Sequence, residues 1–369
     1  MKSPFLCGIE HEIAFLRDDG RFADFTNTTF EELDAVIEKL PVYEADYPVL
    51  RVGDLGIKKK RWYIEGFERY GDQGEYLRTV PKGIEIRTTP RASIAEAVAE
   101  LEESYALLRQ ALAGSGFTPV WLSFNPIQEK FTPTPSLNAW EANWRQSESP
   151  ETLTGGLTVM TFGPDVSLSF ADWDDARAID AGKKLTFYSP VLVPFSFSSP
   201  FYRGELWQGG SIRTFIRTGA RPAAMVFLHD NANAIKSAPS LTQPARVPAE
   251  AGRIEFKAFD AQRDFMRYAA LLALLKGVVL DQTLPGRALV PDAAAHQHAA
   301  ERGFRDQSIA RDAGSVLAAA RAALANDPDA VYLAPLEELL AKRATPADEM
   351  SEAFRQSASL TEALRKLTY

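Results

Sequence analysis

Four segments of the chain alternate apolar and polar side chains, which is the pattern of a β-strand with one buried face. In the first segment Glu10 and Glu12 share one face, and Ile9 and Ile13 share the other. The other segments repeat this arrangement, with an apolar face opposite a face that carries an acidic residue. The segments lie at residues 5–16, 83–88, 165–170 and 253–260. The pattern predicts strands of one sheet whose apolar faces share a core.

Turn residues predict antiparallel pairing of neighbouring strands. Asp19 and Gly20 follow the first strand and precede an apolar stretch at residues 22–25, which is the pattern of a β-hairpin. Gly163 and Pro164 stand in the middle of residues 158–170, which we interpret as a second pair of strands.

Helix signals occur between the strands and dominate the last part of the chain. Thr29 with Glu32 has the spacing of a capping box and predicts a helix to about residue 40. Ser93 with Glu96 predicts another helix, to about residue 113. From residue 262 onward, helical patterns cover residues 262–280, 306–325, 335–343 and 346–366.

These elements predict an α+β fold. We expect a single domain over residues 1–369, with a helical C-terminal portion at about 262–369. An antiparallel sheet would present a concave acidic face on one side and carry helices on its apolar back.

Composition narrows the class of protein. With 24% charged and 46% hydrophobic residues, the chain has the composition of a globular protein. The formal net charge of −8 disfavours nucleic-acid binding, which needs a basic surface. A single cysteine, Cys7, excludes an internal disulfide and fits a reducing cytoplasm.

The sequence also predicts where in the cell the protein is found. The first strand begins too close to Met1 for a signal peptide, and the longest apolar run, at residues 268–275, is too short to span a bilayer. We therefore expect a soluble, cytoplasmic protein that binds neither nucleic acid nor membrane. The sequence leaves open whether the chain forms a homo-oligomer.

Carboxylates recur on the polar faces of the predicted strands. Two acids on one strand, Glu10 and Glu12, are typical of an exposed strand face, but the pattern is repeated on other strands of the same sheet. Neighbouring carboxylates raise each other's pKa unless cations neutralise them. Oxygen ligands in a chain with few histidines favour Mg²⁺ or Mn²⁺ over zinc. The candidate metal ligands are Glu10, Glu12, Glu85, Asp165 and Glu255.

Basic residues accompany these acids and indicate an anionic ligand, for which phosphate is the best candidate. They are Arg87, Arg203, Arg213 and Lys257. Other sites are less well supported, because the chain has neither a P-loop nor a GxGxxG motif after a strand. His296 and His298 are two apart on a helical stretch, where they face different sides. The basic run at residues 58–61 is either a solvated strand edge or an anion-binding loop.

Five short motifs follow one another in a recognisable order. They are Gly-Ile-Glu-His-Glu, Gly-Ile-Glu-Ile-Arg-Thr-Thr-Pro, Ser-Phe-Ser-Ser-Pro-Phe-Tyr-Arg-Gly, Ser-Ile-Arg and Arg-Ile-Glu-Phe-Lys-Ala-Phe-Asp-Ala. With these motifs the chain resembles the glutamate–cysteine ligase family, in particular its second, bacterial carboxylate–amine ligase branch. The resemblance covers roughly residues 5–275.

The resemblance implies the catalytic sheet of the glutamine synthetase-like superfamily and an ATP-dependent reaction. In that reaction ATP phosphorylates a side-chain carboxylate, and an amine displaces the phosphate to give an amide. Arg213 and Lys257 match positions where cationic side chains contact the transferring phosphate or the carboxylate substrate. The metal-ligand strands of the family match Glu10, Glu12, Glu85 and Glu255.

Some positions depart from the family pattern. Asp165 stands where the family usually carries histidine, and Lys257 stands where arginine is common. A carboxylate can still bind Mg²⁺, whereas lysine loses the two-pronged donor geometry of arginine. The family's His-Pro loop appears here as Phe-Asn-Pro at residues 124–126.

The expected function is therefore glutamate–cysteine ligase or a close variant. Its substrates would be a glutamate-like carboxylate, an amine acceptor and ATP, with Mg²⁺ or Mn²⁺ as cofactor. The alternatives are a ligand-binding relative without turnover and a metal-dependent phosphotransferase or hydrolase on the same sheet.

Overall fold

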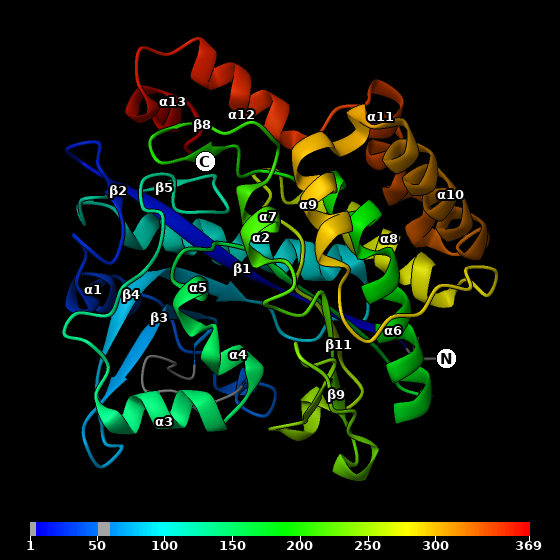
Figure 1. Ribbon diagram of the computed structural model, residues 1–369, viewed down its shortest axis with the longest axis horizontal. Helices are drawn as coiled ribbons and strands as arrows, with labels where there is room; N and C mark the ends of the chain where they lie inside the picture. Colours follow the sequence, from blue (N-terminus) through cyan, green and yellow to red (C-terminus); the bar gives the residue numbers. More distant parts are fainter. Residues whose placement is uncertain (1–4, 51–59) are drawn as a thin grey trace.

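The central strand of the structure is β1 (Phe5–Arg17), which crosses the middle of the molecule in Figure 1. The structure is a computed structural model, and it describes residues 5–50 and 60–369. Six further strands form with β1 a continuous sheet in the order β10-β9-β11-β6-β1-β4-β3. Their bounds are β3 Trp62–Tyr70, β4 Tyr76–Arg87, β6 Asp165–Phe170, β9 Ala224–Leu228, β10 Thr242–Pro244 and β11 Ile254–Phe256.

The sheet is mixed, so the prediction of a purely antiparallel sheet is wrong at one edge. There β10 runs parallel to β9, whereas the other neighbours on the path pair antiparallel. The alternation pattern does not predict β9, because all five of its residues are buried. A strand buried on both faces reads as one apolar run without alternation.

The far end of β1 pairs with two short strands, β2 (Phe22–Ala23) and β5 (Phe117–Val120). The predicted hairpin is confirmed, because β2 pairs antiparallel with β1 and Gly20 takes a φ of 84° that favours glycine. On this part of β1 the front face is apolar, since Leu16 belongs to a buried cluster with Leu364. The acidic part of the strand is thus confined to its middle.

Three helices pack on the apolar back of the sheet: α2 (Ile94–Ala111), α6 (Asp175–Leu192) and α8 (Met266–Leu280). Behind the sheet, Ile9 shares one buried cluster with Leu101 of α2 and Leu272 of α8. Two more helices, α10 (Gln307–Ala323) and α11 (Ala334–Lys342), cover α8 at the side of the molecule seen on the right in Figure 1. No helix in the described ranges is long and apolar enough to cross a membrane.

Side-chain caps place several helix starts where the sequence predicts them. Helix α1 (Phe30–Ile37) begins after Thr29, whose Oγ1 accepts a hydrogen bond from the Glu32 amide at 3.2 Å. The predicted helix at 346–366 is instead two helices, α12 (Pro346–Arg355) and α13 (Leu360–Lys366). The break arises because Ser359 caps a new helix.

The front of the sheet carries shorter elements. The segment at residues 158–164, predicted as a strand, is instead the end of α5, a turn and an isolated bridge between Thr161 and Phe124, so only β6 remains of that strand pair. The front helices are α3 (Ala139–Ser147), α4 (Pro150–Leu153), α5 (Gly155–Thr158) and α7 (Ile212–Arg217). The remaining short elements are β7 (Phe201–Tyr202), β8 (Glu205–Leu206), α9 (Ala293–Arg302) and 3₁₀ turns at Glu44–Asp46, Val193–Phe195, Asn231–Asn233, Pro248–Glu250, Gly303–Arg305 and Pro328–Leu333.

The described part of the basic run at 58–61 has neither of its two predicted roles. Lys58 and Lys59 lie outside the described residues. Lys60 is buried, and its Nζ donates to the carbonyl oxygens of Ile37 and Leu40 at the end of α1, at 2.8 and 3.0 Å. Arg61 is buried against Asp46. These two side chains stabilise the fold from inside.

His296 on α9 predicts how stability depends on pH. Its buried Nδ1 donates to the Asp292 carbonyl at 2.8 Å, and burial lowers its pKa from 6.5 to about 4. As the pH falls below 6.5, His296 binds a proton in the unfolded chain but stays neutral in the folded chain. The free energy of unfolding therefore decreases. The His296→Gln variant lacks the titrating imidazole, so its free energy of unfolding does not have this pH dependence. In urea titrations the stability of the wild type relative to His296→Gln should fall by about 2 kcal/mol between about pH 7 and pH 5. A difference that does not change with pH would contradict this account.

Candidate active site

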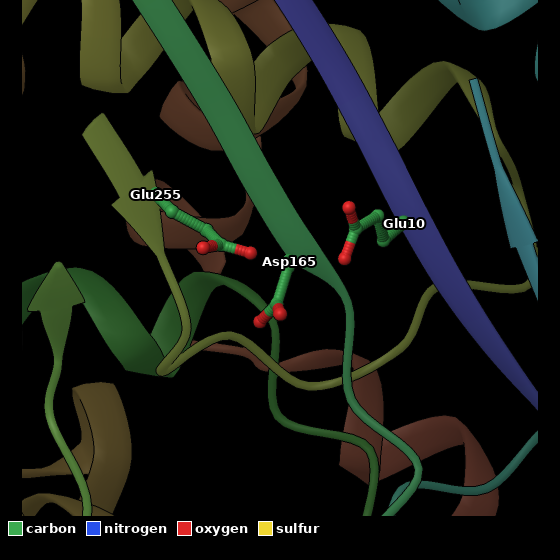
Figure 2. Close-up of side chains that lie close together, drawn as sticks. All are labelled: Glu10, Asp165 and Glu255. Atoms are coloured by element: carbon green, nitrogen blue, oxygen red, sulfur yellow. The ribbon is translucent and has the colours of Figure 1, made fainter. Parts of the chain in front are cut away.

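The polar face of the sheet carries two groups of three carboxylates. Figure 2 shows the first carboxylate trio, in which side chains from β1, β6 and β11 approach one another. In each trio one oxygen per residue lies within 4.8 Å of the others. The first trio is Glu10, Asp165 and Glu255, and the second is Glu12, Glu65 and Glu85.

Strand pairing brings these residues together. Glu10 pairs with Asp165 across β1 and β6, and Glu12 pairs with Glu85 across β1 and β4. Residues directly opposite each other in adjacent strands project from the same face of a sheet. All five predicted metal ligands therefore lie on one surface, as the alternation pattern predicts.

Glu65 completes the second trio and is not among the metal ligands predicted from the sequence. It follows Tyr63 by two residues on β3, and Tyr63 pairs with Glu85, so Glu65 points to the same face. The signal was present in the sequence, since the alternation of Tyr63 and Ile64 extends to Glu65.

The second trio has the character of a cation site. Glu85 is only 4% exposed, and its Oε1 has no hydrogen-bond partner among the described residues. Burial, and then the neighbouring charges of Glu65, Glu10 and Glu12, raise the pKa of Glu85 well above its usual value. A buried carboxylate with an unused oxygen is costly unless a cation neutralises it. The donor set, all carboxylate oxygens, fits Mg²⁺ or Mn²⁺.

A lysine enters the second trio from a β-bulge. Gly66 pairs with Pro81 and Glu65 pairs with Gly83, so Lys82 is an extra residue on β4. A bulge changes the direction of a side chain, and here Lys82 Nζ lies 2.7 Å from Glu12 Oε1 and 3.6 Å from Glu65 Oε2. Burial opposes the charge of Lys82, but Glu12 and Glu65 outweigh it and raise the lysine's pKa.

Two basic residues of the β11 segment contact the first trio. Lys257 Nζ lies 2.5 Å from Asp165 Oδ2 and 3.0 Å from Glu255 Oε1. Arg253 lies 3.5 Å from both Glu10 and Glu255. Burial raises the pKa of Asp165 to about 7 even though Lys257 opposes this shift. For Glu255 burial acts in the same direction, but Lys257 and Arg253 together hold its pKa below the usual value.

Both trios line a cavity of about 280 Å³ that basic residues also line. Three arginines spaced four residues apart, Arg213, Arg217 and Arg221, line this cavity from α7 and the turn that follows it. The six carboxylates of the trios thus share one cavity with these three arginines, and Glu151, Arg246 and Lys257 line it too.

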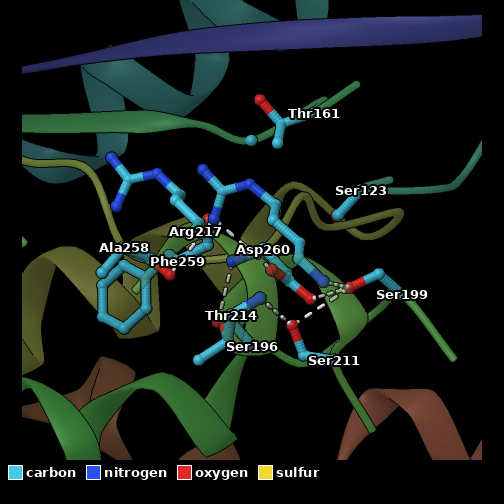
Figure 3. A network of polar contacts seen from close by, with 12 residues as sticks. Ser123, Thr161, Ser196, Ser199, Ser211, Thr214, Arg217, Ala258, Phe259 and Asp260 are labelled. Carbon is cyan, nitrogen blue, oxygen red and sulfur yellow. Dashed lines mark hydrogen bonds and ion pairs between the residues drawn. The ribbon is translucent and has the colours of Figure 1, made fainter. Parts of the chain in front are cut away.

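A buried polar network holds Arg213 in place. Its Nη1 donates to the carbonyls of Ala258 and Phe259 at 3.2 and 2.8 Å, and lies 3.5 Å from Asp260 Oδ1. Figure 3 shows Asp260 among the serines that surround it, including Ser199, whose Oγ donates to Asp260 Oδ2 at 2.8 Å. Backbone carbonyls and a buried acid therefore fix the direction of this guanidinium.

Gly163 makes room for the same guanidinium. A Cβ at this position would lie 1.9 Å from Arg213 Nη2. The Gly163 amide also donates to Glu12 Oε2 at 2.7 Å. Gly163, which interrupts the predicted strand pair, thus lies close to both Glu12 and Arg213.

Arg217 and Arg221 have hydrogen-bonding capacity left for a ligand. Their Nη1 atoms donate to the carbonyls of Pro222 and Glu151 at 2.9 and 2.7 Å. In the ranges that the structure describes, neither forms an ion pair with a carboxylate. Burial, with Arg213 and Arg221 nearby, lowers the pKa of Arg217 well below its usual value. Cations buried together without a counter-ion favour an anion in the cavity.

A second cavity, of about 110 Å³, adjoins the first and shares Glu10, Tyr63 and Arg246 with it. Its lining is more apolar and includes Leu6 and Leu50. The predicted ligand-binding residue Arg87 lies here, with its guanidinium 5.0 Å from the centre of the Tyr63 ring.

Arg203 lies apart from both cavities. It stands in the β7–β8 turn, where its side chain is 63% exposed and its Nε is 2.9 Å from Glu129. It is not among the described residues that line either cavity. Arg203 therefore lies away from the other predicted ligand-binding residues, Arg87, Arg213 and Lys257, which line the cavities.

The fold has counterparts among solved structures. The bifunctional glutathione synthetase of Pasteurella multocida aligns with 98% of this chain at 12% identity and a TM-score of 0.58, but this chain spans only 51% of that protein. Glutamate–cysteine ligase from Francisella tularensis, solved with AMP, aligns at 13% identity and a TM-score of 0.56 over 98% of this chain and 88% of its own. The ligase PafA, in complex with the ubiquitin-like protein Pup, aligns at 11% identity and a TM-score of 0.52 over 98% and 68%.

These similarities show that the chain shares its fold with the three proteins. A model of glutamate–cysteine ligase family 2 matches residues 6–237, which is more than half of the chain, and the chain belongs to this family. No curated protein matches the sequence.

Proposed function

We propose that the chain is an ATP-dependent carboxylate–amine ligase, most simply a glutamate–cysteine ligase or a close variant, that uses Mg²⁺ or Mn²⁺. The observation that carries the proposal is the cavity that the six carboxylates of the two trios share with Arg213, Arg217 and Arg221. Such a cavity can hold a metal–nucleotide and an anionic substrate side by side. A cytoplasmic enzyme would find ATP and reduced thiol substrates at hand.

The two adjoining cavities support a position for ATP. The apolar lining of the second cavity, with Leu50 and Tyr63, suits a nucleotide base. Glu10 belongs to both cavities, so the phosphates would extend past it toward the trios. The Francisella ligase was solved with AMP, which supports a nucleotide site in this fold.

The carboxylate trios are the residues that would hold the metal. When bound, the metal would supply positive charge that balances the negative charge of the ATP phosphates and of the transferring phosphoryl group. Arg213, held by its buried network, would bind the transferring phosphoryl group or the substrate carboxylate. Arg217 and Arg221 would orient the remaining anionic groups.

The reaction has two steps. A carboxylate oxygen of the substrate attacks the γ-phosphorus of ATP, and the bond from that phosphorus to the β–γ bridging oxygen breaks, which releases ADP. The amine nitrogen then attacks the acyl carbon, the bond from that carbon to the phosphate oxygen breaks, and the amine loses a proton to solvent. An acyl phosphate reacts readily with an amine held in place, so no strong base is required.

Release of ADP with a panel of acceptors tests the proposed reaction. The purified chain is incubated with ATP, Mg²⁺ and glutamate, together with cysteine or another amino acid or amine. We expect ADP and amide in equal amounts, and only when both the carboxylate and the amine are present.

Other outcomes identify the alternatives. ADP release that needs only water would indicate a hydrolase, and a stable phosphorylated product would indicate a phosphotransferase. Nucleotide binding without any ADP release would indicate a relative without turnover.

A further inference from the structure

The two carboxylate trios differ in how the described chain neutralises them. In the first trio every carboxylate lies within 3.5 Å of a lysine or arginine nitrogen: Asp165 and Glu255 of Lys257, and Glu10 of Arg253. In the second trio Lys82 lies 2.7 Å from Glu12 and 3.6 Å from Glu65, but no lysine or arginine of the described chain lies within ion-pair distance of Glu85. Each carboxylate of the first trio thus has a cation from the protein itself, whereas Glu85 has none among the described residues.

Lys257 is built into its position. Its amide donates to the Ala223 carbonyl at 2.8 Å, and its own carbonyl accepts from Arg213 Nη2 at 3.1 Å. These contacts fix the backbone from both sides, and the side chain reaches back to Glu255, two residues earlier on the same face. The ammonium group therefore lies between Asp165 and Glu255, within the space that those two oxygens would offer to a metal ion.

Glu85 gives the second trio an independent sign of a ligand. Its side chain is more than nine-tenths buried, lines the main cavity, and leaves Oε1 without a hydrogen-bond partner among the described residues. In the first trio Glu255 Oε2 also lacks a hydrogen bond, but it lies 3.5 Å from Arg253 Nη2. An uncompensated buried carboxylate attracts a divalent cation more strongly than one that is already paired.

We propose that Lys257 acts as a built-in cation in the first carboxylate trio, so that the nucleotide-free chain binds one divalent metal ion, at the second trio. This inference deepens the proposed function, since it concerns the same site, but it makes no use of turnover. The inference also gives a single role to the two residues, Asp165 and Lys257, that differ from the family pattern. Asp165 in place of histidine and Lys257 in place of arginine form one ion pair with each other.

Counting bound Mn²⁺ tests this inference. Free Mn²⁺ is measured by electron paramagnetic resonance during titration of the nucleotide-free protein. The wild type should bind one ion, without the line broadening of two neighbouring ions. Lys257→Met, which keeps the length of the side chain and removes its charge, should bind a second ion with a dissociation constant within about tenfold of the first. Lys236→Met, on an exposed lysine, is the matched control and should bind one ion.

Two results would overturn the inference. One is two ions of similar affinity in the wild type, and the other is a folded Lys257→Met protein that binds no additional ion. The wild-type count decides the matter even if Lys257→Met fails to fold. Because the measurement needs neither ATP nor an acceptor, a failed ligase assay leaves this result intact, and a failed ion count leaves the ligase assay intact.

Discussion

Glu85→Gln should abolish turnover and weaken Mn²⁺ binding by more than about 100-fold. Removal of groups that merely support a ligand already costs about 10- to 100-fold in metal affinity, and Glu85 would be a ligand itself. The same change should stabilise the metal-free protein, because it removes a buried carboxylate that Glu65, Glu10 and Glu12 repel. We expect an increase in Tm of about 2 °C or more in the presence of a chelator.

The opposite signs of these effects distinguish a metal ligand from a structural acid. Glu129→Gln is the matched control, because Glu129 is an exposed glutamate that pairs with Arg203 outside the cavities. It should change neither turnover nor Mn²⁺ binding. If Glu85→Gln lost stability and kept its affinity for Mn²⁺, Glu85 would have a structural role and the second trio would not be the metal site.

Arg213→Lys should reduce kcat/KM about 100- to 1,000-fold, the cost of removing one well-placed donor to a developing charge. Lysine keeps the positive charge but cannot bind two carbonyls and face the cavity at once, as the Arg213 guanidinium does. The substitution leaves Asp260 with a weaker partner, so the Tm of the variant must be measured beside its kinetics.

Arg203→Lys is the control for this experiment. Both arginines belong to the motifs that suggest the family, but only Arg213 lines the cavity in the described structure. Steady-state kinetics of a folded Arg213→Lys protein within threefold of the wild type would exclude Arg213 from catalysis. A large loss in Arg203→Lys would mean that the site extends to the β7–β8 turn.

The acidic face could be predicted from the sequence because strand alternation is local. Glu10, Glu12, Glu85 and Glu255 each stand opposite an apolar neighbour, so the side of the sheet that each one faces can be read without the fold. The sequence did not predict which strands pair, and it is this pairing that brings the four carboxylates together. The same reasoning extends to Glu65, two residues after Tyr63 on β3, and to Arg253, two residues before Glu255.

The positions of the basic residues around the acids depend on structural features that strand alternation does not predict. Lys82 faces the site only because a bulge inserts one residue into β4, and a bulge breaks the period on which the prediction relies. Arg217 and Arg221 follow Arg213 at helical spacing, but α7 is one short helix whose pattern spans few residues. The parallel edge of the sheet was missed because β9 is buried on both faces.

The central claim is that ATP activates a carboxylate as an acyl phosphate. Hydroxylamine can replace an unidentified acceptor, because it is a small nucleophile that traps such an intermediate as a hydroxamate. The chain is given ATP, Mg²⁺, hydroxylamine and glutamate with ¹⁸O in its carboxyl groups, and the phosphate released is analysed by mass spectrometry. The account predicts one ¹⁸O atom in each phosphate formed with hydroxamate. Phosphate that carries oxygen from water alone, or AMP and pyrophosphate as products, would contradict it.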